Sequence, residues 1–273
     1  MACHSENPIG LFDSGVGGLT IMKEVVKHLP NENIVYFGDT ARLPYGNKSP
    51  QAILRYTLAN VSFLLDHKIK ILIIACFTAS SHTLEILEQK LSIPVIGVIQ
   101  SGFEALAAAT AKKIAILGTS STIRSGVLQT LISKRDPSIA VHPIACPLLA
   151  PLIEEGLAGH PAARMIVEHY LQPLKENNID AALLACTHYP LIRDTIQEIL
   201  GPSVQLIEPA ECCAIKAKEQ LASQGVLNQS KLEPVYEFFA SDDPDKFCYL
   251  AHQFMGAEIK KVRAFHASPV PLE

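Results

Sequence analysis

Short apolar runs alternate with longer segments of helical pattern along almost the whole chain. The runs have the length of strands and lie at 9–12, 34–37, 71–75, 94–98, 114–117, 141–144, 181–185, 204–207 and 236–240. Helical pattern follows Gly18 and covers 50–67, 80–91, 102–109, 162–176 and 209–224, and Pro244 can begin another helix. This alternation is typical of βα units. Because the runs are continuously apolar, as in strands covered on both faces, the predicted fold class is α/β with mostly parallel sheets flanked by helices.

Two segments of the chain resemble each other. Residues 71–78 and 181–188 both consist of an apolar strand, then Ala-Cys, then residues with hydroxyl groups. The two cysteines, Cys76 and Cys186, are about one small domain apart. We therefore expect two similar α/β domains with the active site at their interface, since ligands bind at the carboxyl ends of parallel strands.

The predicted domain boundaries follow from where the chain can cross between the halves, near 99–102 and near 208–209. Residues 1–99 and 210–273 form the first predicted domain, which carries Asp13 and Cys76. Residues 100–209 form the second, which carries Glu154, Cys186 and His188.

Composition excludes several classes of protein. With 273 residues, 48% of them hydrophobic, the chain can bury its own cores. A net charge of −4 leaves no basic face for nucleic acid. No apolar run approaches the roughly 20 residues that cross a membrane, and the first eight residues do not form a secretory signal. We expect a cytoplasmic protein that binds a small molecule.

The cysteines predict neither structural disulfides nor a metal site. There are seven, an odd number, at positions 3, 76, 146, 186, 212, 213 and 248, and none forms a Cys-x-x-Cys pair.

A glycine-rich turn follows the first predicted strand. Residues 13–18 read Asp-Ser-Gly-Val-Gly-Gly and lead into a helix, so backbone N–H groups can approach an anion such as a carboxylate. The glycine spacing of a dinucleotide site is missing, because Thr20 stands three positions after Gly17. A tight strand-to-helix turn without a ligand is the alternative.

Each of the two matched cysteines lies where a strand ends. Cys76 precedes a helix, whose N–H groups and dipole favour a thiolate. Cys186 lies two residues before His188, which offers a proton partner. Racemisation suits such a pair, because one thiol removes the Cα proton and the other returns one to the opposite face. A buried cysteine with no role beyond packing is the alternative for each, and a hydrolase built on Cys186 and His188 would leave Cys76 without a purpose.

The assembled motifs resemble those of the glutamate racemase family over nearly the whole chain. They are Phe12–Gly18, Gly38–Thr40, Leu43–Gly46, Ala75-Cys76, Thr78–Ser80, Gly118-Thr119, Ala145–Pro147, Pro151–Glu155 and Ala185–Pro190. The resemblance implies conversion of L- to D-glutamate for peptidoglycan synthesis, with neither a cofactor nor a metal, in a homodimer.

The resemblance also implies roles for individual residues. Cys76 and Cys186 are the two acid/base groups, assisted by Asp13 near Cys76 and by Glu154 and His188 near Cys186. The substrate-binding residues it implies are Ser14, Pro44, Tyr45, Gly46, Phe77, Thr78, Thr119 and Thr187.

Two positions depart from the family pattern. Phe77 stands where the family has an asparagine that helps to bind the substrate, and losing such a hydrogen bond costs about 1.5–3 kcal/mol. Glu208 stands where aspartate is expected and can either replace it or cap the next helix. Phe77 leaves open a racemase for aspartate or a related acid, or a weakly active regulatory member of the fold. The expected role of Cys146, Cys212, Cys213 and Cys248 is packing or partial exposure, and that of His82 is structural.

Overall fold

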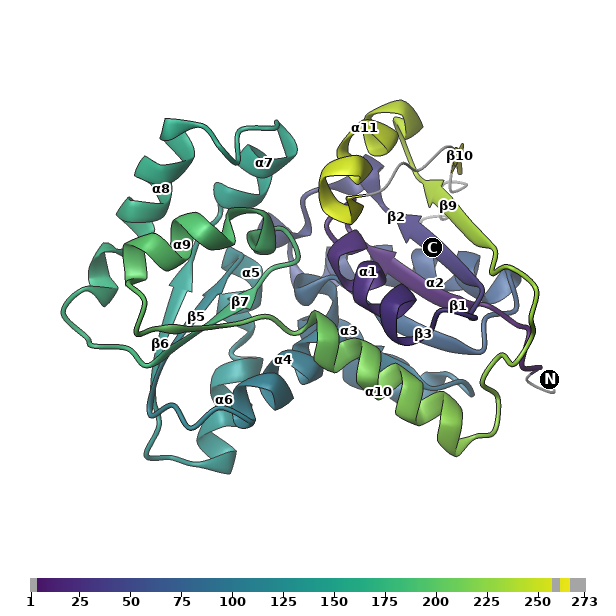
Figure 1. Ribbon diagram of the computed structural model, residues 1–273, viewed down its shortest axis with the longest axis horizontal. Helices are drawn as coiled ribbons and strands as arrows, with labels where there is room; N and C mark the ends of the chain where they lie inside the picture. Colours follow the sequence, from purple (N-terminus) through teal and green to yellow (C-terminus); the bar gives the residue numbers. More distant parts are fainter. Residues whose placement is uncertain (1–3, 257–260, 266–273) are drawn as a thin grey trace.

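The protein, described here by a computed structural model for residues 4–256 and 261–265, contains two parallel sheets (Figure 1). The first has the order β10–β9–β2–β1–β3–β4, with bounds Val262–Ala264, Tyr236–Ala240, Ile34–Gly38, Ile9–Asp13, Ile71–Ile74 and Val95–Gly97. The second has the order β6–β5–β7–β8, with bounds Ala140–Ala145, Lys113–Gly118, Ala181–Ala185 and Gln205–Ile207. All pairings within them are parallel. The predicted α/β class is confirmed.

Eleven α-helices flank these sheets in the described part of the chain. They are α1 (Leu19–His28), α2 (Pro50–Asp66), α3 (Phe77–Lys90), α4 (Val98–Ala107), α5 (Ser120–Ser125), α6 (Val127–Arg135), α7 (Leu149–Glu154), α8 (Pro161–Leu171), α9 (Arg193–Leu200), α10 (Ala210–Ser223) and α11 (Pro244–Met255). Short 3-10 turns lie at Thr40–Arg42, Tyr45–Asn47, Gln172–Leu174 and Tyr189–Ile192.

Helices cover both faces of the first sheet. Ile9 and Leu11 of β1 belong to the same buried cluster as the inner side of α1, which packs against α10. Phe12, the next residue along, points to the opposite face and belongs to a second cluster with Ile53 and Leu64 of α2. This alternation of direction explains why β1 is apolar from Ile9 to Phe12, because each face of the strand is buried under helices.

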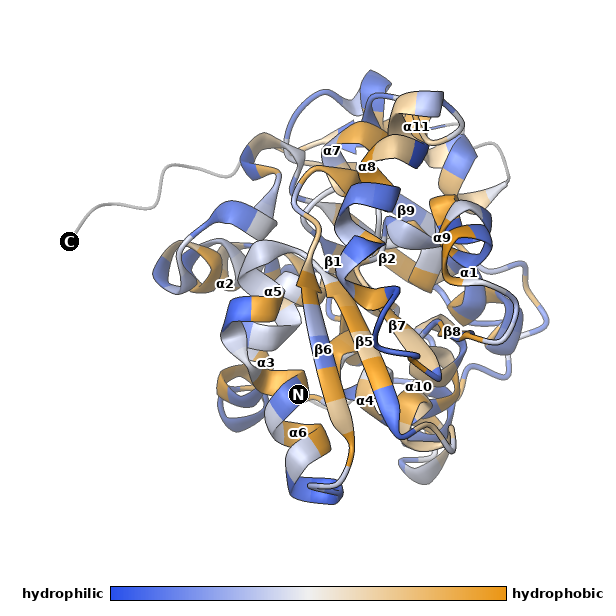
Figure 2. Ribbon diagram, turned by 90° about the vertical axis from the view of Figure 1, so that its left-hand side faces the viewer, coloured by the Kyte–Doolittle hydropathy of each residue, from blue (hydrophilic) through white to orange (hydrophobic). Residues whose placement is uncertain are grey.

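The second sheet differs at its edge. Its inner strands β5, after Lys113 at its start, and β7 are apolar and buried, whereas β6 is only partly buried and contains Pro143. Proline lacks the N–H that a central strand needs, so an edge is the position that tolerates it. Figure 2 shows hydrophobic residues along β5 and hydrophilic ones interrupting β6.

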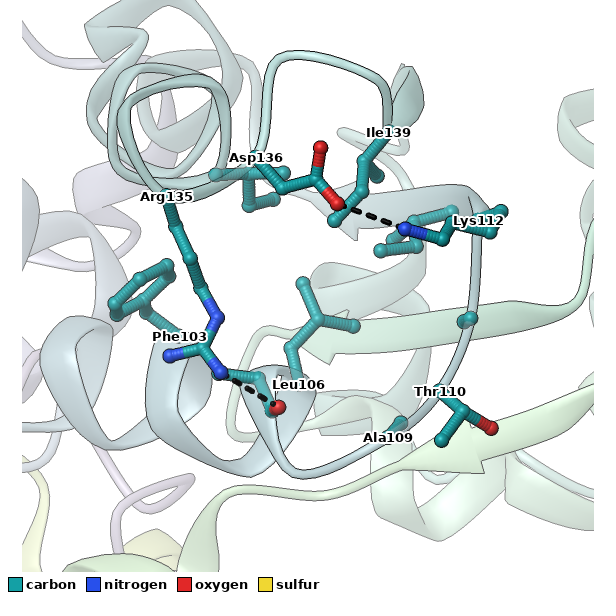
Figure 3. Close-up of a pocket in the computed structure, with 12 residues that line it drawn as sticks. Phe103, Leu106, Ala109, Thr110, Lys112, Arg135, Asp136 and Ile139 are labelled. Atoms are coloured by element: carbon teal, nitrogen blue, oxygen red, sulfur yellow. Dashed lines mark hydrogen bonds and ion pairs between the residues drawn. The ribbon is translucent and has the colours of Figure 1, made fainter.

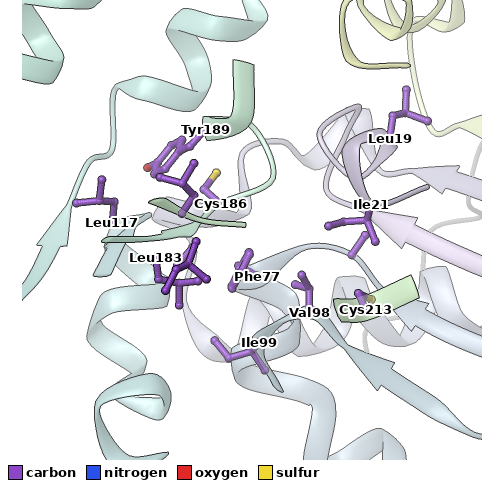
Figure 4. Close-up of a cluster of buried hydrophobic side chains, with 14 of the residues drawn as sticks. Leu19, Ile21, Phe77, Val98, Ile99, Leu117, Leu183, Cys186, Tyr189 and Cys213 are labelled. Atoms are coloured by element: carbon purple, nitrogen blue, oxygen red, sulfur yellow. The ribbon is translucent and has the colours of Figure 1, made fainter. Parts of the chain in front are cut away.

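A continuous apolar cluster joins the two sheets beneath the functional site. Phe77, the first residue of α3, lies between Val98 of α4 and Leu183 of β7 (Figure 4). A Cβ added to Gly102 would lie 3.2 Å from the Phe77 ring, so this helix and ring approach each other closely. The chain passes between the sheets after β4 and after β8. The assignment of whole segments to two domains remains a prediction.

Among the described residues, no helix combines the length and apolar character that crossing a bilayer demands.

Candidate active site

The two matched cysteines line one shared cavity. Cys76 is the N-cap residue of α3, two residues after β3, and Cys186 directly follows β7, so each lies at the carboxyl end of a strand in its own sheet. Both side chains are buried, with 5% of each residue exposed. The cavity measures about 20 Å³ and is lined by Ser14, Leu43, Pro44, Tyr45, Gly46, Cys76, Phe77, Thr78, Thr119, Ala150, Cys186, Thr187 and His188.

Asp13 lies close to both halves of this site. It ends β1 and is fully buried, and its carboxylate accepts a hydrogen bond from the Gly15 N–H at 3.0 Å. The Thr187 hydroxyl, from the loop after β7, lies 3.5 Å from the other carboxylate oxygen. Burial raises the pKa of Asp13, although the charge of His188 opposes that rise. A carboxylate with a raised pKa accepts a proton more readily.

The Cys76 thiol lies against two polar neighbours in a buried setting that favours its protonated form. Its Sγ lies 3.7 Å from the Ser14 hydroxyl and 3.5 Å from the Ala79 N–H. Burial, and after it the charge of Asp13, raise the pKa of Cys76 to about 12 against the opposing effect of the Ala79 N–H. The start of α3 favours the thiolate through the Ala79 N–H, as expected, but desolvation outweighs this effect.

The other thiol belongs to a chain of three polar side chains. His188 Nδ1 lies 3.7 Å from Cys186 Sγ, and His188 Nε2 lies 2.7 Å from Glu154 Oε1. All three residues are buried. Burial lowers the pKa of His188, but the Glu154 carboxylate and the hydrogen bonds to both partners outweigh it, so the pKa ends well above its usual value. These contacts favour the imidazolium form of His188, whose Nδ1 faces Cys186.

Threonine hydroxyls connect the two halves of the cavity wall. Thr78 Oγ1 on α3 lies 2.9 Å from Thr119 Oγ1 and 3.1 Å from Thr122 Oγ1, both at the start of α5. Hydroxyls both donate and accept, so this cluster can bind a carboxylate. Thr122 was missed by sequence reasoning, although its place three residues after the N-cap Thr119 was a usable signal.

The loop of Pro44, Tyr45 and Gly46 closes the cavity from the first sheet. A Cβ on Gly46 would lie 2.6 Å from that of Thr119, so only glycine fits between the loop and α5. The Tyr45 hydroxyl hydrogen-bonds to the buried Asp39 carboxylate and accepts a bond from Asn60 Nδ2 at 3.0 Å. Tyr45 therefore presents its ring, while its hydroxyl is used for support. No sequence signal singled out Asn60, which lies within α2.

The Phe77 side chain contacts both the cavity and the apolar cluster between the sheets. It lines the cavity, yet only 2% of the residue is exposed and its ring packs in the apolar cluster between the sheets. Glu208 is the other position that departs from the family pattern. It does not line the cavity, and its carboxylate pairs with Arg193 at 2.7 Å. Cys146 is buried, with its pKa raised to about 12 by that burial.

The remaining candidates lie outside the cavity. His82 Nε2 lies 2.9 Å from the Ser121 hydroxyl, in agreement with a structural role. Cys213 is buried, and Cys212 and Cys248 are partly exposed. The described cysteines are all free, and Cys3 lies outside the described residues.

Other clusters do not reproduce this chemistry. A cavity of about 260 Å³ lies where α4 and α6 end, lined in part by Leu106 and Ile139; across it Arg135 bonds to the Ala107 carbonyl, and Lys112 pairs with Asp136 (Figure 3). It contains no thiol. Among described residues, the one group with metal-ligand geometry is Glu24, His28 and Glu211, none of which lines the thiol cavity.

Known proteins resemble this chain along most of its length. A sequence model of the Asp/Glu/Hydantoin racemase family matches residues 9–217. A glutamate racemase of Chlorobaculum tepidum is 44% identical over 260 residues, which cover 94% of this chain and 96% of the relative.

Solved structures agree. Glutamate racemase isoform RacE1 of Bacillus anthracis has a TM-score of 0.91 at 37% identity, and the match covers 96% of this chain and 98% of that one. A Francisella tularensis glutamate racemase, solved in complex with D-glutamate, has a TM-score of 0.90 at 36% identity with the same coverage. The chain therefore belongs to the Asp/Glu/Hydantoin racemase family, as an amino-acid isomerase of the glutamate racemase type.

Proposed function

We propose that this protein interconverts L- and D-glutamate without a cofactor, using Cys76 and Cys186 as opposed acid and base. The observation that carries the proposal is the pair of buried thiols, one at the end of a strand in each sheet, lining the same cavity. Each thiol has its own proton partner, Asp13 for Cys76 and the His188–Glu154 pair for Cys186. The substrate is proposed from the glutamate racemases that the chain resembles.

In each direction one thiolate removes the Cα proton and the opposite thiol donates one. The bond from carbon to hydrogen breaks on one face and forms on the other, so protons and electrons balance within a single turnover. Cys76 must first lose its own proton, and the buried Asp13 carboxylate, whose charge already acts on this thiol, is the acceptor at hand. For Cys186, the imidazolium form of His188 stabilises the thiolate and can donate a proton to it.

The carbanion forms at Cα, between the two thiols. Hydrogen bonds to the substrate carboxylate stabilise it. The hydroxyls of Thr78, Thr119 and Thr187 line the cavity and can hydrogen-bond to this carboxylate. Preorganised donors in a buried site are effective because they need no rearrangement during the reaction.

Substrate entry requires movement. A cavity of about 20 Å³ has room for about one water molecule, far less than an amino acid. We infer that the elements carrying the two sheets separate to admit glutamate and close again before proton transfer, which also excludes water from the thiols.

We further propose that the product serves peptidoglycan synthesis in the cytoplasm and that the active protein is a homodimer. These proposals rest on the family resemblance. Sedimentation equilibrium of the purified protein tests the last, and a monomer at micromolar concentration would contradict it.

The decisive assay follows D- and L-glutamate by circular dichroism with no cofactor added. We expect each enantiomer to lose its signal as the racemate forms. A second candidate, racemisation of aspartate or a related acid, is kept because Phe77 places a ring in the cavity wall where the family has an amide. Turnover of aspartate with none of glutamate would replace the first proposal by the second.

A further inference from the structure

Helix α11 reaches the candidate site from outside the cavity. It follows β9 of the first sheet and packs against α1. In Figure 1 it lies at the side of the first sheet that faces α7. Phe254, near its end, is 3% exposed and does not line the thiol cavity.

The Phe254 ring packs directly on the imidazole of His188. Their centroids are 5.4 Å apart and their planes are nearly perpendicular, at 87°. Perpendicular pairs at this spacing are a favoured aromatic arrangement. A residue of the C-terminal helix, on the first sheet, thus touches the proton partner of the thiol on the second.

His188 is confined on its other sides as well. Its two nitrogens face Cys186 at 3.7 Å and Glu154 at 2.7 Å. A Cβ added to Gly17 would lie 2.5 Å from His188 Cε1, so the glycine-rich turn also lies against the ring. The hydrogen bond to Glu154 fixes only the Nε2 end of the imidazole ring. Rotation of the ring about this hydrogen bond is therefore resisted by the side chains packed against it.

We infer that Phe254 is a positioning residue that holds the His188 ring in the orientation from which Nδ1 reaches Cys186. This inference rests on the proposed two-thiol function. A second contact joins the same helix to α7, because Lys246 Nζ lies 3.0 Å from Oε1 of Glu155, the neighbour of Glu154. That pair is exposed and contributes little, so the buried Phe254 contact is the one that matters.

The test replaces the ring while keeping an apolar side chain, in Phe254→Leu and, as a second variant of different shape, Phe254→Met. Phe63→Leu is the matched control. Phe63 is also buried, on α2, and packs on a histidine, His67, at a centroid distance of 4.5 Å, outside the cavity. The control measures what loss of such a ring does without reaching His188.

We expect kcat to fall about 10- to 100-fold in the Phe254 variants with KM nearly unchanged, because small misplacements of a catalytic group are costly. The two enantiomers have equal free energies, so kcat/KM must fall equally in both directions. Isotope effects distinguish the mechanism. With α-deuterated glutamate, the primary kinetic isotope effect should rise only in the direction in which Cys186 removes the Cα proton. In deuterated water the solvent effect should rise only in the reverse direction.

Phe254 variants that lose activity only in proportion to folded protein, with isotope effects like those of Phe63→Leu, would overturn the inference. If Phe254→Leu does not fold, Phe254→Met carries the same comparison. Failure of the proposed function is separately visible in the wild type, as product without solvent deuterium at Cα.

Discussion

Replacing Phe77 with asparagine should change stability and substrate binding in opposite directions. The ring is 2% exposed and lies in the apolar cluster with Val98 and Leu183, against Gly102. Truncating a buried phenylalanine costs about 3–5 kcal/mol of unfolding free energy. For a chain of this size such a loss lowers the melting temperature by about 6–20 °C.

The binding effect has the other sign. Phe77 also lines the cavity, so an amide there can hydrogen-bond to a charged group of glutamate. That bond is worth about 1.5–3 kcal/mol, which corresponds to roughly 10- to 150-fold in affinity. We therefore expect Phe77→Asn to bind glutamate more tightly although it unfolds at a lower temperature.

Two measurements separate these effects: thermal unfolding by calorimetry, and KM for glutamate by circular dichroism well below the transition. Phe77→Leu is the control, because it keeps an apolar side chain but cannot form the bond. It should lose less stability and gain no affinity. A Phe77→Asn protein with the same melting temperature as the wild type would refute the packing argument. An unchanged KM for glutamate would refute the binding argument.

Three further predictions concern residues around the site and in the core. Gly17→Ala should abolish measurable racemisation with an unchanged far-ultraviolet spectrum, because the added Cβ would overlap His188; retained turnover would show that the imidazole can move aside. Lys70 is fully buried and paired with the buried Glu32, so Lys70→Met should lower the unfolding free energy by about 3–5 kcal/mol in urea titrations, and a loss below about 1 kcal/mol would contradict this. With a pKa near 12, Cys76 in the free enzyme is a neutral thiol at pH 7, so its alkylation by iodoacetamide, followed by peptide mass spectrometry, should accelerate up to pH 10; a plateau by pH 9 would disprove it.

The strands were the most predictable part of the fold, because short, continuously apolar runs bounded by polar turns are typical of buried strands. Helix starts were less predictable. Helix α3 begins at Phe77 rather than at residue 80, since Cys76 acts as the N-cap through its sulfur, an uncommon capping group. Strand β10 was not predicted, because its residues, Val262–Ala264, are too few to show a pattern.

The site was predictable where residues follow strand ends and not where support comes from helices. Asp13 is the last residue of β1, and His188 lies in the turn after β7. Asn60 supports Tyr45 from within α2, and Phe254 reaches His188 from the far end of the chain. Contacts of this kind depend on tertiary packing, which periodicity does not encode. Burial likewise outweighs the local effect of the helix start on the pKa of Cys76.

The two-thiol mechanism is tested most directly in deuterated water with the wild type, Cys76→Ser and Cys186→Ser. The product formed first by the wild type should carry deuterium at Cα, while the unreacted enantiomer recovered at the same time keeps its hydrogen. Each serine variant should lose racemisation almost completely, because one face of Cα then lacks its acid or base. Full activity in either variant, or equal deuterium in recovered substrate and product, would contradict the assignment of one thiol to each face.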